Sequence, residues 1–348
     1  RGMSSAASDV YKRQTLNGYT SGQVTLNSVG DTYDNLISID GITTSEVSMA
    51  AAAVKVTSNI DKTKLDTLRG DTTGTVTVAD ITEDKTDLGT ISKYGDVDLT
   101  TANISVTGNV SKAEADTIDG YNSTSGTVTL STVTDTFANI KLLHEDTSIS
   151  IASAAVTVTN AASLANAGTL NGYTSGQVTL NSVEDTYDNL ISIDGITTSE
   201  VSMAAAAVKV TSNIDKTKLD TLRGDTTGTV TVADITEDKT DLGTISKYGD
   251  VDLTTANISV TGNVSKAEAD TIDGYNSTSG TVTLSTVTDT FANIKLLHED
   301  TSISIASAAV TVTNAATLAN ANTLNGYTSG QVTLNSVEDT VANITSID

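Results

Sequence analysis

The chain has 348 residues, of which 43 are acidic and 19 basic, so its net charge at pH 7 is −24. It contains no Pro, Cys or Trp. The absence of Cys excludes disulfide bonds, thiol catalysis and cysteine-ligated metal sites. The negative charge disfavours binding to nucleic-acid phosphates, and no apolar run of about 18 residues predicts a membrane span.

Residues 1–14 differ from the rest of the chain, which is a tandem repeat. A continuing repeat would place AVTVTNAASLANAG before Thr15, but the chain reads RGMSSAASDVYKRQ there. That string resembles translated sequencing-adapter sequence of the kind found at the ends of proteins from metagenomic assemblies. We therefore predict that residues 1–14 are not native, and we begin the fold prediction at Thr15.

From Thr15 onward the sequence repeats with a period of 154 residues. TLNGYTSGQVTLNSV begins at Thr15, Thr169 and Thr323, and the two full copies differ at three positions: Gly30/Glu184, Ser163/Thr317 and Gly168/Asn322. We expect a first unit at 15–168, a second at 169–322 and the start of a third at 323–348, in one continuous solenoid. Related lines at residues 67 and 117 divide each long unit into three modules of about 51 residues.

Within a module, short helices alternate with strands. Residues 110–121 predict a two-turn helix that Asn109 or Ser111 caps, with a capping box between Ser111 and Glu114 and a left-handed C-cap at Gly120. Residues 126–133 alternate as a strand, with Val128 and Leu130 on one face.

The rest of the module repeats this order. Residues 134–143 predict a second helix with Phe137 and Ile140 on its apolar side, and 148–160 predict one bent strand or two consecutive strands. A further helix follows in AASLANAGTLNG. We expect Ala50–Ala53 and the copy Ala204–Ala207 to lie where a narrow coil leaves no room for large side chains.

These elements predict an α/β repeat solenoid. A strand and a short helix every 20–29 residues is typical of solenoids, and this spacing gives about 13 right-handed coils with parallel, stacked strands. The alternative is an all-β solenoid in which the short helices are only turns, because isolated two-turn helices are marginal.

No residue set predicts catalysis, so we expect no enzyme and no required cofactor. His144 and its copy His298 are the only histidines, and a histidine near a helix end usually interacts with the helix dipole. Arg69-Gly70-Asp71 spells an integrin-type tripeptide, but Gly70 is more simply a helix C-cap. Acidic pairs such as Glu83-Asp84 and Glu145-Asp146 match no calcium loop, which leaves diffuse calcium binding as the open alternative.

Thr-x-Thr pairs on the strands predict a repeated outward surface. Such a ladder resembles the ice-binding face of some β-solenoid antifreeze proteins, although Lys55 and Ser105 interrupt it, and threonine also suits any exposed strand. The candidate binding face comprises Thr75, Thr77, Thr127, Thr129, Thr157, Thr159, Thr229, Thr231, Thr281 and Thr283.

The pattern as a whole (VTVTNAASLANAGTLNGYTSGQVTL, then EDTYDNLISIDG) resembles the Thr/Val/Asp-rich tandem repeats of giant extracellular proteins from marine bacteria and cyanobacteria. The resemblance implies a secreted or cell-surface, adhesin-like or filamentous role, and it assigns no functional residue. We expect a non-catalytic acidic rod, stalk or filament that self-associates along its axis or side by side. The alternative is a repeated face that binds ice, glycan or cations.

Overall fold

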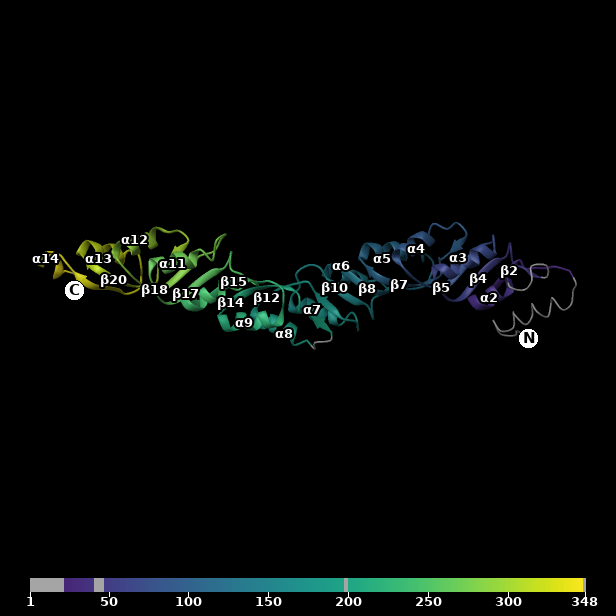
Figure 1. Cartoon of the computed structure of the whole chain (residues 1–348), viewed down its shortest axis with the longest axis horizontal. Helices are drawn as coiled ribbons and strands as arrows, with labels where there is room; N and C mark the ends of the chain where they lie inside the picture. Colours follow the sequence, from purple (N-terminus) through teal and green to yellow (C-terminus); the bar gives the residue numbers. More distant parts are fainter. Residues whose placement is uncertain (1–21, 41–46, 197–199, 347–348) are drawn as a thin grey trace. The chain divides into compact units, whose positions relative to one another are not determined.

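The computed structural model describes residues 22–40, 47–196 and 200–346. The chain divides into two compact units, the first comprising residues 1–159 and 169–179 and the second 160–168 and 180–348. In both units strands alternate with short helices along the chain (Figure 1). This order confirms the predicted α/β solenoid over the all-β alternative.

The first unit contains β1 (Val24–Thr25), β2 (Ser28–Asp31), α2 (Tyr33–Asp40), β3 (Val47–Ser48), β4 (Ala53–Ile60), α3 (Lys62–Asp71), β5 (Val76–Asp84), α4 (Lys85–Ile91), β6 (Val97–Asp98), β7 (Asn103–Val110), α5 (Lys112–Asp119), β8 (Val128–Asp135), α6 (Phe137–Glu145), β9 (Ile149–Ser150) and β10 (Ala155–Val158). Two elements contain residues of both units: α7 (Leu164–Asn171) and β11 (Val178–Leu180).

The second unit contains β12 (Ser182–Asp185), α8 (Tyr187–Asp194), β13 (Val201–Ser202), β14 (Ala207–Ile214), α9 (Lys216–Asp225), β15 (Val230–Asp238), α10 (Lys239–Ile245), β16 (Val251–Asp252), β17 (Asn257–Val264), α11 (Lys266–Asp273), β18 (Val282–Asp289), α12 (Phe291–Glu299), β19 (Ile303–Ser304), β20 (Ala309–Ala316), α13 (Leu318–Asn325), β21 (Val332–Val337) and α14 (Val341–Ile344).

Strands pair in parallel with strands of the coils before and after them. The first unit has the order β2-β4-β5-β7-β8-β10, with β6 beside β5 and β9 beside β8; the second has β12-β14-β15-β17-β18-β20-β21. Ile81 of β5 pairs with Ile104 of β7, and Ile104 pairs in turn with Val128 of β8. The steps between these partners give a coil of about 23 residues, within the range of strand-plus-helix solenoid repeats.

Matching apolar residues stack from coil to coil. Ile60, Ile81, Ile104, Val128 and Ile149 pair in succession across five strands, and all five are buried. Each interior helix covers this layer with residues three apart, such as Leu65 and Leu68 in α3 or Leu88 and Ile91 in α4. Neighbouring helices contact one another, and α3, α4, α5 and α6 lie in a row along the upper side of the strands in Figure 1.

The prediction for residues 110–133 is largely confirmed. Ser111 caps α5 and forms the capping box with Glu114, and Val128 and Leu130 of β8 are buried. Gly120 was wrongly predicted to be left-handed: its φ is −59°, and the helix continues into it in right-handed geometry. The segment 148–160 forms two consecutive strands, β9 and β10, which was the second of the two predicted forms.

Two details of the predicted core are wrong. In α6 the buried pair is Ile140 with Leu143, while Phe137 at the first helical position is only half-buried. Within Ala50–Ala53 only Ala52 is buried, because Ala50 and Ala51 form the exposed turn between β3 and β4. The same holds in the copy, where Ala206 is the buried residue of Ala204–Ala207.

Candidate functional site

The predicted threonines lie on the outer side of the strands, away from the helices. Thr77, Thr129, Thr157, Thr231 and Thr283 are half-buried strand residues that alternate with buried valines and leucines. Those at the strand ends are exposed: Thr75, Thr127, Thr159, Thr229 and Thr281. The sequence thus predicted their outward direction correctly, and their role in binding stays a prediction.

Strand register places these threonines in different rows. Thr129 pairs with Ser105 on one side and Ser150 on the other, and Ser105 also pairs with Thr82, so one row carries four hydroxyl groups. Thr77 instead lies between Lys55 and Asp98. Because stacked strands lie about 4.8 Å apart, the hydroxyl row is regular but short.

Asparagine side chains connect neighbouring coils beside these rows. Asn59 Nδ2 donates to Thr82 Oγ1 at 2.9 Å, and Asn103 Nδ2 donates to Asp80 Oδ1 at 2.9 Å. The backbone N–H of Thr127 donates to Asn103 Oδ1 at 3.1 Å. These outer polar groups therefore hydrogen bond to the chain itself as well as to water.

At four places in the described chain, an aspartate at or just after a strand end fastens two helices together. Asp135 accepts the backbone N–H of Thr136 at 2.7 Å, the side-chain amide of Asn139 at 2.8 Å and the backbone N–H of Lys112 at 2.8 Å. Lys112 begins α5 in the preceding coil, whereas Asn139 lies in α6. The same contacts recur at Asp185, Asp289 and Asp339.

Burial of the Asp135 carboxylate alone would raise its pKa, but the hydrogen bonds from Lys112, Asn139 and Thr136 outweigh burial, and the pKa lies below its ordinary value. The pKa of Asp289 is lowered in the same way. The sequence analysis missed this role. Its signal was the recurrence of Asp-Thr followed by Asn at the start of α6, α8, α12 and α14, as in Asp135, Thr136 and Asn139.

We expect this fastening to weaken in acid. A carboxylate whose pKa is lowered on folding stabilises the protein fully above the unfolded pKa of about 4, and this contribution is lost as the pH falls through the folded pKa. Asp135→Asn combined with Asp289→Asn should lower the thermal midpoint at pH 7 and flatten its decline below about pH 5. Melts followed by circular dichroism from pH 7 to pH 3 test this, with light scattering to detect precipitation near the pI of about 4.1.

The control is Asp87→Asn with Asp241→Asn, which removes the same charge from the first turns of α4 and α10. That variant should keep the steep acid decline of the unchanged chain. Equal pH profiles for the two double variants would contradict the assigned role of Asp135 and Asp289.

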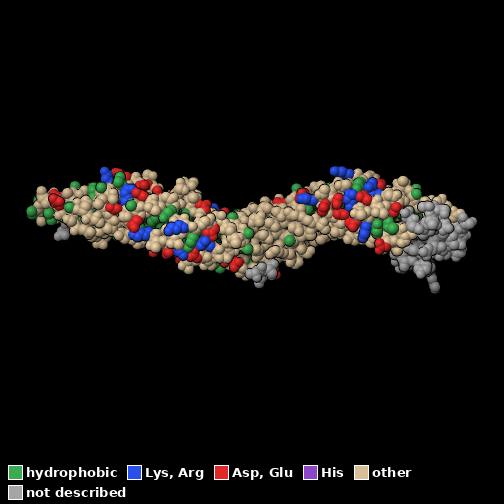
Figure 2. All heavy atoms as spheres, in the orientation of Figure 1, with side chains coloured by type: hydrophobic (Ala, Val, Ile, Leu, Met, Phe, Trp, Pro, Cys, Tyr) green, Lys and Arg blue, Asp and Glu red, His purple; other side chains and the backbone are tan. Residues whose placement is uncertain are grey.

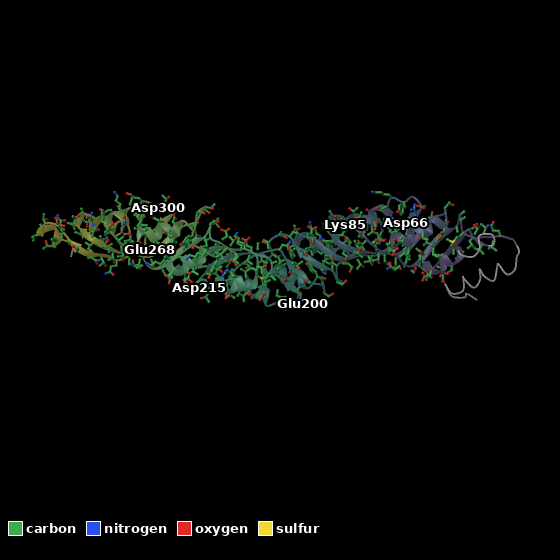
Figure 3. All side chains as sticks on the ribbon, viewed as in Figure 1. Asp66, Lys85, Glu200, Asp215, Glu268 and Asp300 are labelled. Carbon is green, nitrogen blue, oxygen red and sulfur yellow. The ribbon has the colours of Figure 1, made fainter. Side chains whose placement is uncertain are left out.

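Basic side chains rest on tyrosines of the helix layer. The Arg69 guanidinium carbon lies 3.6 Å from the centroid of the Tyr94 ring, and its Nε and Nη2 donate to Asp96 Oδ1 at 3.0 and 2.9 Å. The hydrogen bonds from Arg69 hold the pKa of Asp96 below its ordinary value. Asp66 of the same helix, which Figure 3 labels, adds a second ion pair to Arg69.

This network engages the arginine of the integrin-type tripeptide. Arg69, Gly70 and Asp71 form the last turn of α3, and the C-cap is Thr72, so the predicted C-cap at Gly70 is wrong. In the copy, burial first and the nearby Asp194 second raise the pKa of Asp225. Arg223 repeats the contacts with Tyr248 and Asp250.

The histidines are also engaged on the helix layer. His144 lies in the last turn of α6, as predicted for interaction with the helix dipole, and its ring stacks on Tyr173 with centroids 3.9 Å apart. His298 stacks on Tyr327 at the same distance. The sequence predicted the helix end but not the stacking partner, which comes from the next coil.

Carboxylates of the acidic pairs accept hydrogen bonds at helix caps and turns. Asp84 caps α4 through the backbone N–H groups of Thr86 and Asp87, and Asp146 accepts from Ser148. Among the described residues, no three His, Asp or Glu side chains gather into a group that could hold a metal ion. Figure 2 shows acidic and basic side chains intermixed over α3, α4 and α5.

Every helix in the described ranges is too short or too polar to cross a bilayer. No family model, curated protein or solved structure matches the chain.

Proposed function

We propose that this chain is a non-catalytic structural segment of a large extracellular or cell-surface repeat protein, serving as an acidic stalk or filament that self-associates. The observation that supports this most directly is the coil-to-coil fastening, which recurs in both units. Asp135 and Asp289, Arg69 and Arg223, and the stacked apolar rows all connect a coil to its neighbour.

Two further properties fit a structural segment. Each coil contacts its neighbours in the stack, so stability grows with the number of stacked coils. The net charge of −24 keeps a long polymer soluble, and divalent or other cations between chains would reduce the repulsion that opposes side-by-side association. Exposed strand edges offer backbone groups for association along the axis.

The alternative function is a repeated binding face for ice, glycan or cations. The row of Thr82, Ser105, Thr129 and Ser150 favours it, because four outward hydroxyl groups at strand spacing match a regular hydrogen-bonding partner. The two functions differ in how much they depend on those hydroxyl groups.

Removing the hydroxyls discriminates between them. We expect Thr77→Val with Thr129→Val, and the copies Thr231→Val with Thr283→Val, to leave folding and self-association unchanged, because valine suits an outward strand position. Negative-stain imaging and sedimentation would measure assembly, while thermal hysteresis and a glycan array would measure binding. Ice or glycan binding that disappears in this variant would favour the alternative. Isolated monomers at every concentration would contradict the filament, although a stalk would remain compatible.

A further inference from the structure

Six tyrosines of the described chain carry a basic or imidazole group over the ring. Arg69 lies over Tyr94, Lys64 lies 5.4 Å from the Tyr33 centroid, and His144 stacks on Tyr173. The copies in the second unit repeat this at Tyr187, Tyr248 and Tyr327. Within the described ranges, Tyr121 and its copy Tyr275 have no such partner.

The repeat explains why Tyr121 lacks one. His144, which stacks on Tyr173, precedes that tyrosine in the sequence by the same interval as Ser92 precedes Tyr121. Ser92 follows the end of α4 as His144 occupies the last turn of α6. The short serine side chain cannot reach over a ring as an imidazole does. The ring-covering group that Tyr173 has is therefore missing at Tyr121.

A hollow lies at this place. Its volume is about 320 Å³, and Tyr121, Ser92, Asp98, Thr100 and Ser123 are among its lining residues. Both hydrogen bonds from Thr100, through its backbone N–H and its hydroxyl, go to Asp98 Oδ1. These bonds lower the pKa of Asp98, so its carboxylate is charged at neutral pH.

Elsewhere in the chain, a tyrosine ring and an aspartate together bind an arginine side chain. At Tyr94 and Asp96 the guanidinium of Arg69 stacks on the ring while its nitrogens donate to the carboxylate. A planar cation satisfies both partners at once, because the ring face is negative and the guanidinium donates in a fixed fork. Tyr121 and Asp98 bring the same two groups to one hollow without the cation.

We propose that the hollow at Tyr121, and the matching residues at Tyr275, Ser246 and Asp252, bind a guanidinium or ammonium group of another molecule. Lys85, which lines a second hollow with Tyr121, does not compete, because it pairs with Glu114 at 2.7 Å. The net charge of −24 attracts cations toward these sites from a distance. This inference is independent of whether the chain forms filaments.

The test uses the full chain and N-acetyl-L-argininamide, with uncharged N-acetyl-L-citrullinamide as the matched probe. Saturation-transfer and aromatic NMR titrations should show saturable binding of argininamide at two sites per chain. Citrullinamide should bind about tenfold more weakly, because it lacks the charge that the ring and carboxylate attract. Equal binding of the two probes would overturn the proposal.

Three double variants locate the site. Ser92→His with Ser246→His should abolish binding, because each histidine would cover its tyrosine as His144 covers Tyr173. Asp98→Asn with Asp252→Asn should weaken binding about three- to tenfold. Asp87→Asn with Asp241→Asn removes the same charge outside the hollow and should bind within about twofold of the unchanged chain. Argininamide affinity that is the same in all three variants would show only diffuse attraction and would overturn the site.

A last titration distinguishes an arginine side chain of a protein from a free organic cation. An acetylated peptide with one arginine between glycine and serine residues is titrated beside argininamide. Tighter binding of the peptide would identify an arginine side chain of a protein partner, and equal binding would identify a free organic cation. In both cases the Ser92→His and Ser246→His variant must remove the signal for the proposal to hold.

Discussion

Val128→Asp, made together with Val282→Asp in the copy, is expected to disrupt the fold of both units. Val128 is fully buried and pairs with Ile104 on one side and Ile149 on the other. A carboxylate placed there has no basic partner and no water, and such a buried, unpaired charge costs about 3–5 kcal/mol. Far-UV circular dichroism and thermal melting should show a large drop in the midpoint or loss of the transition.

The matched control is Thr129→Asp with Thr283→Asp, one residue further along the same strands. Thr129 is half-buried on the outer side and pairs with Ser105 and Ser150. An aspartate there keeps its water, so we expect a change within about 1 kcal/mol. Unchanged melting of the Val128 variant, or equal damage from the Thr129 variant, would show that the inward and outward faces of β8 are wrongly assigned.

Two of the features that the sequence predicted correctly depend on neighbouring residues alone. The capping box of Ser111 and Glu114 spans three positions, and the alternation around Val128 has a period of two. The break within 148–160 was one of the two forms expected there. Because the capping box and the alternation each lie within a few neighbouring residues, a single sequence is enough to predict them, whereas the stacking of strands followed from the repeat spacing.

The errors concern helix ends and the turn between two strands. Gly70 was expected to be the C-cap of its helix and Gly120 a left-handed C-cap, but α3 runs on to Asp71 and Gly120 is right-handed. The alanines of 50–53 were expected to share one environment, and only Ala52 does lie inside. A glycine near a helix end permits left-handed geometry without requiring it, and which alanine of a run lies inside depends on where the turn between two strands falls.

The candidate site divides in the same way. The outward direction of Thr77 and Thr129 followed from alternation, whereas their different partners, Lys55 and Ser105, depend on register. The cation–tyrosine contacts were also missed, because Arg69 and Tyr94 lie far apart in the sequence and belong to successive coils. The nearly exact 154-residue copy did not help here, since a repeated sequence does not show which coils meet.

Gly74→Ala, with Gly228→Ala in the copy, is expected to destabilise both units by about 2–4 kcal/mol. A Cβ on Gly74 would lie 2.2 Å from the carbonyl oxygen and 2.6 Å from the carbonyl carbon of Ala52, so the backbone must shift. That same oxygen accepts the Thr72 hydroxyl at 2.6 Å, and Thr72 Oγ1 accepts the Gly74 N–H at 3.0 Å. The shift therefore breaks a buried hydrogen-bonded turn as well as creating a steric clash.

Gly70→Ala with Gly224→Ala supplies the control within the same segment. A Cβ on Gly70 meets nothing within 4 Å, and Gly70 lies in the last turn of α3, where alanine is the better helix former by about 1 kcal/mol. Denaturant midpoints should therefore move in opposite directions for the same chemical change four residues apart. A loss of stability in both variants would mean that glycine is required throughout this turn. A loss of stability in neither variant would mean that the contact between Gly74 and Ala52 does not fix the spacing of the coils. Only opposite signs are consistent with a fold in which the approach of one coil to the next, and not the helix that precedes it, selects glycine.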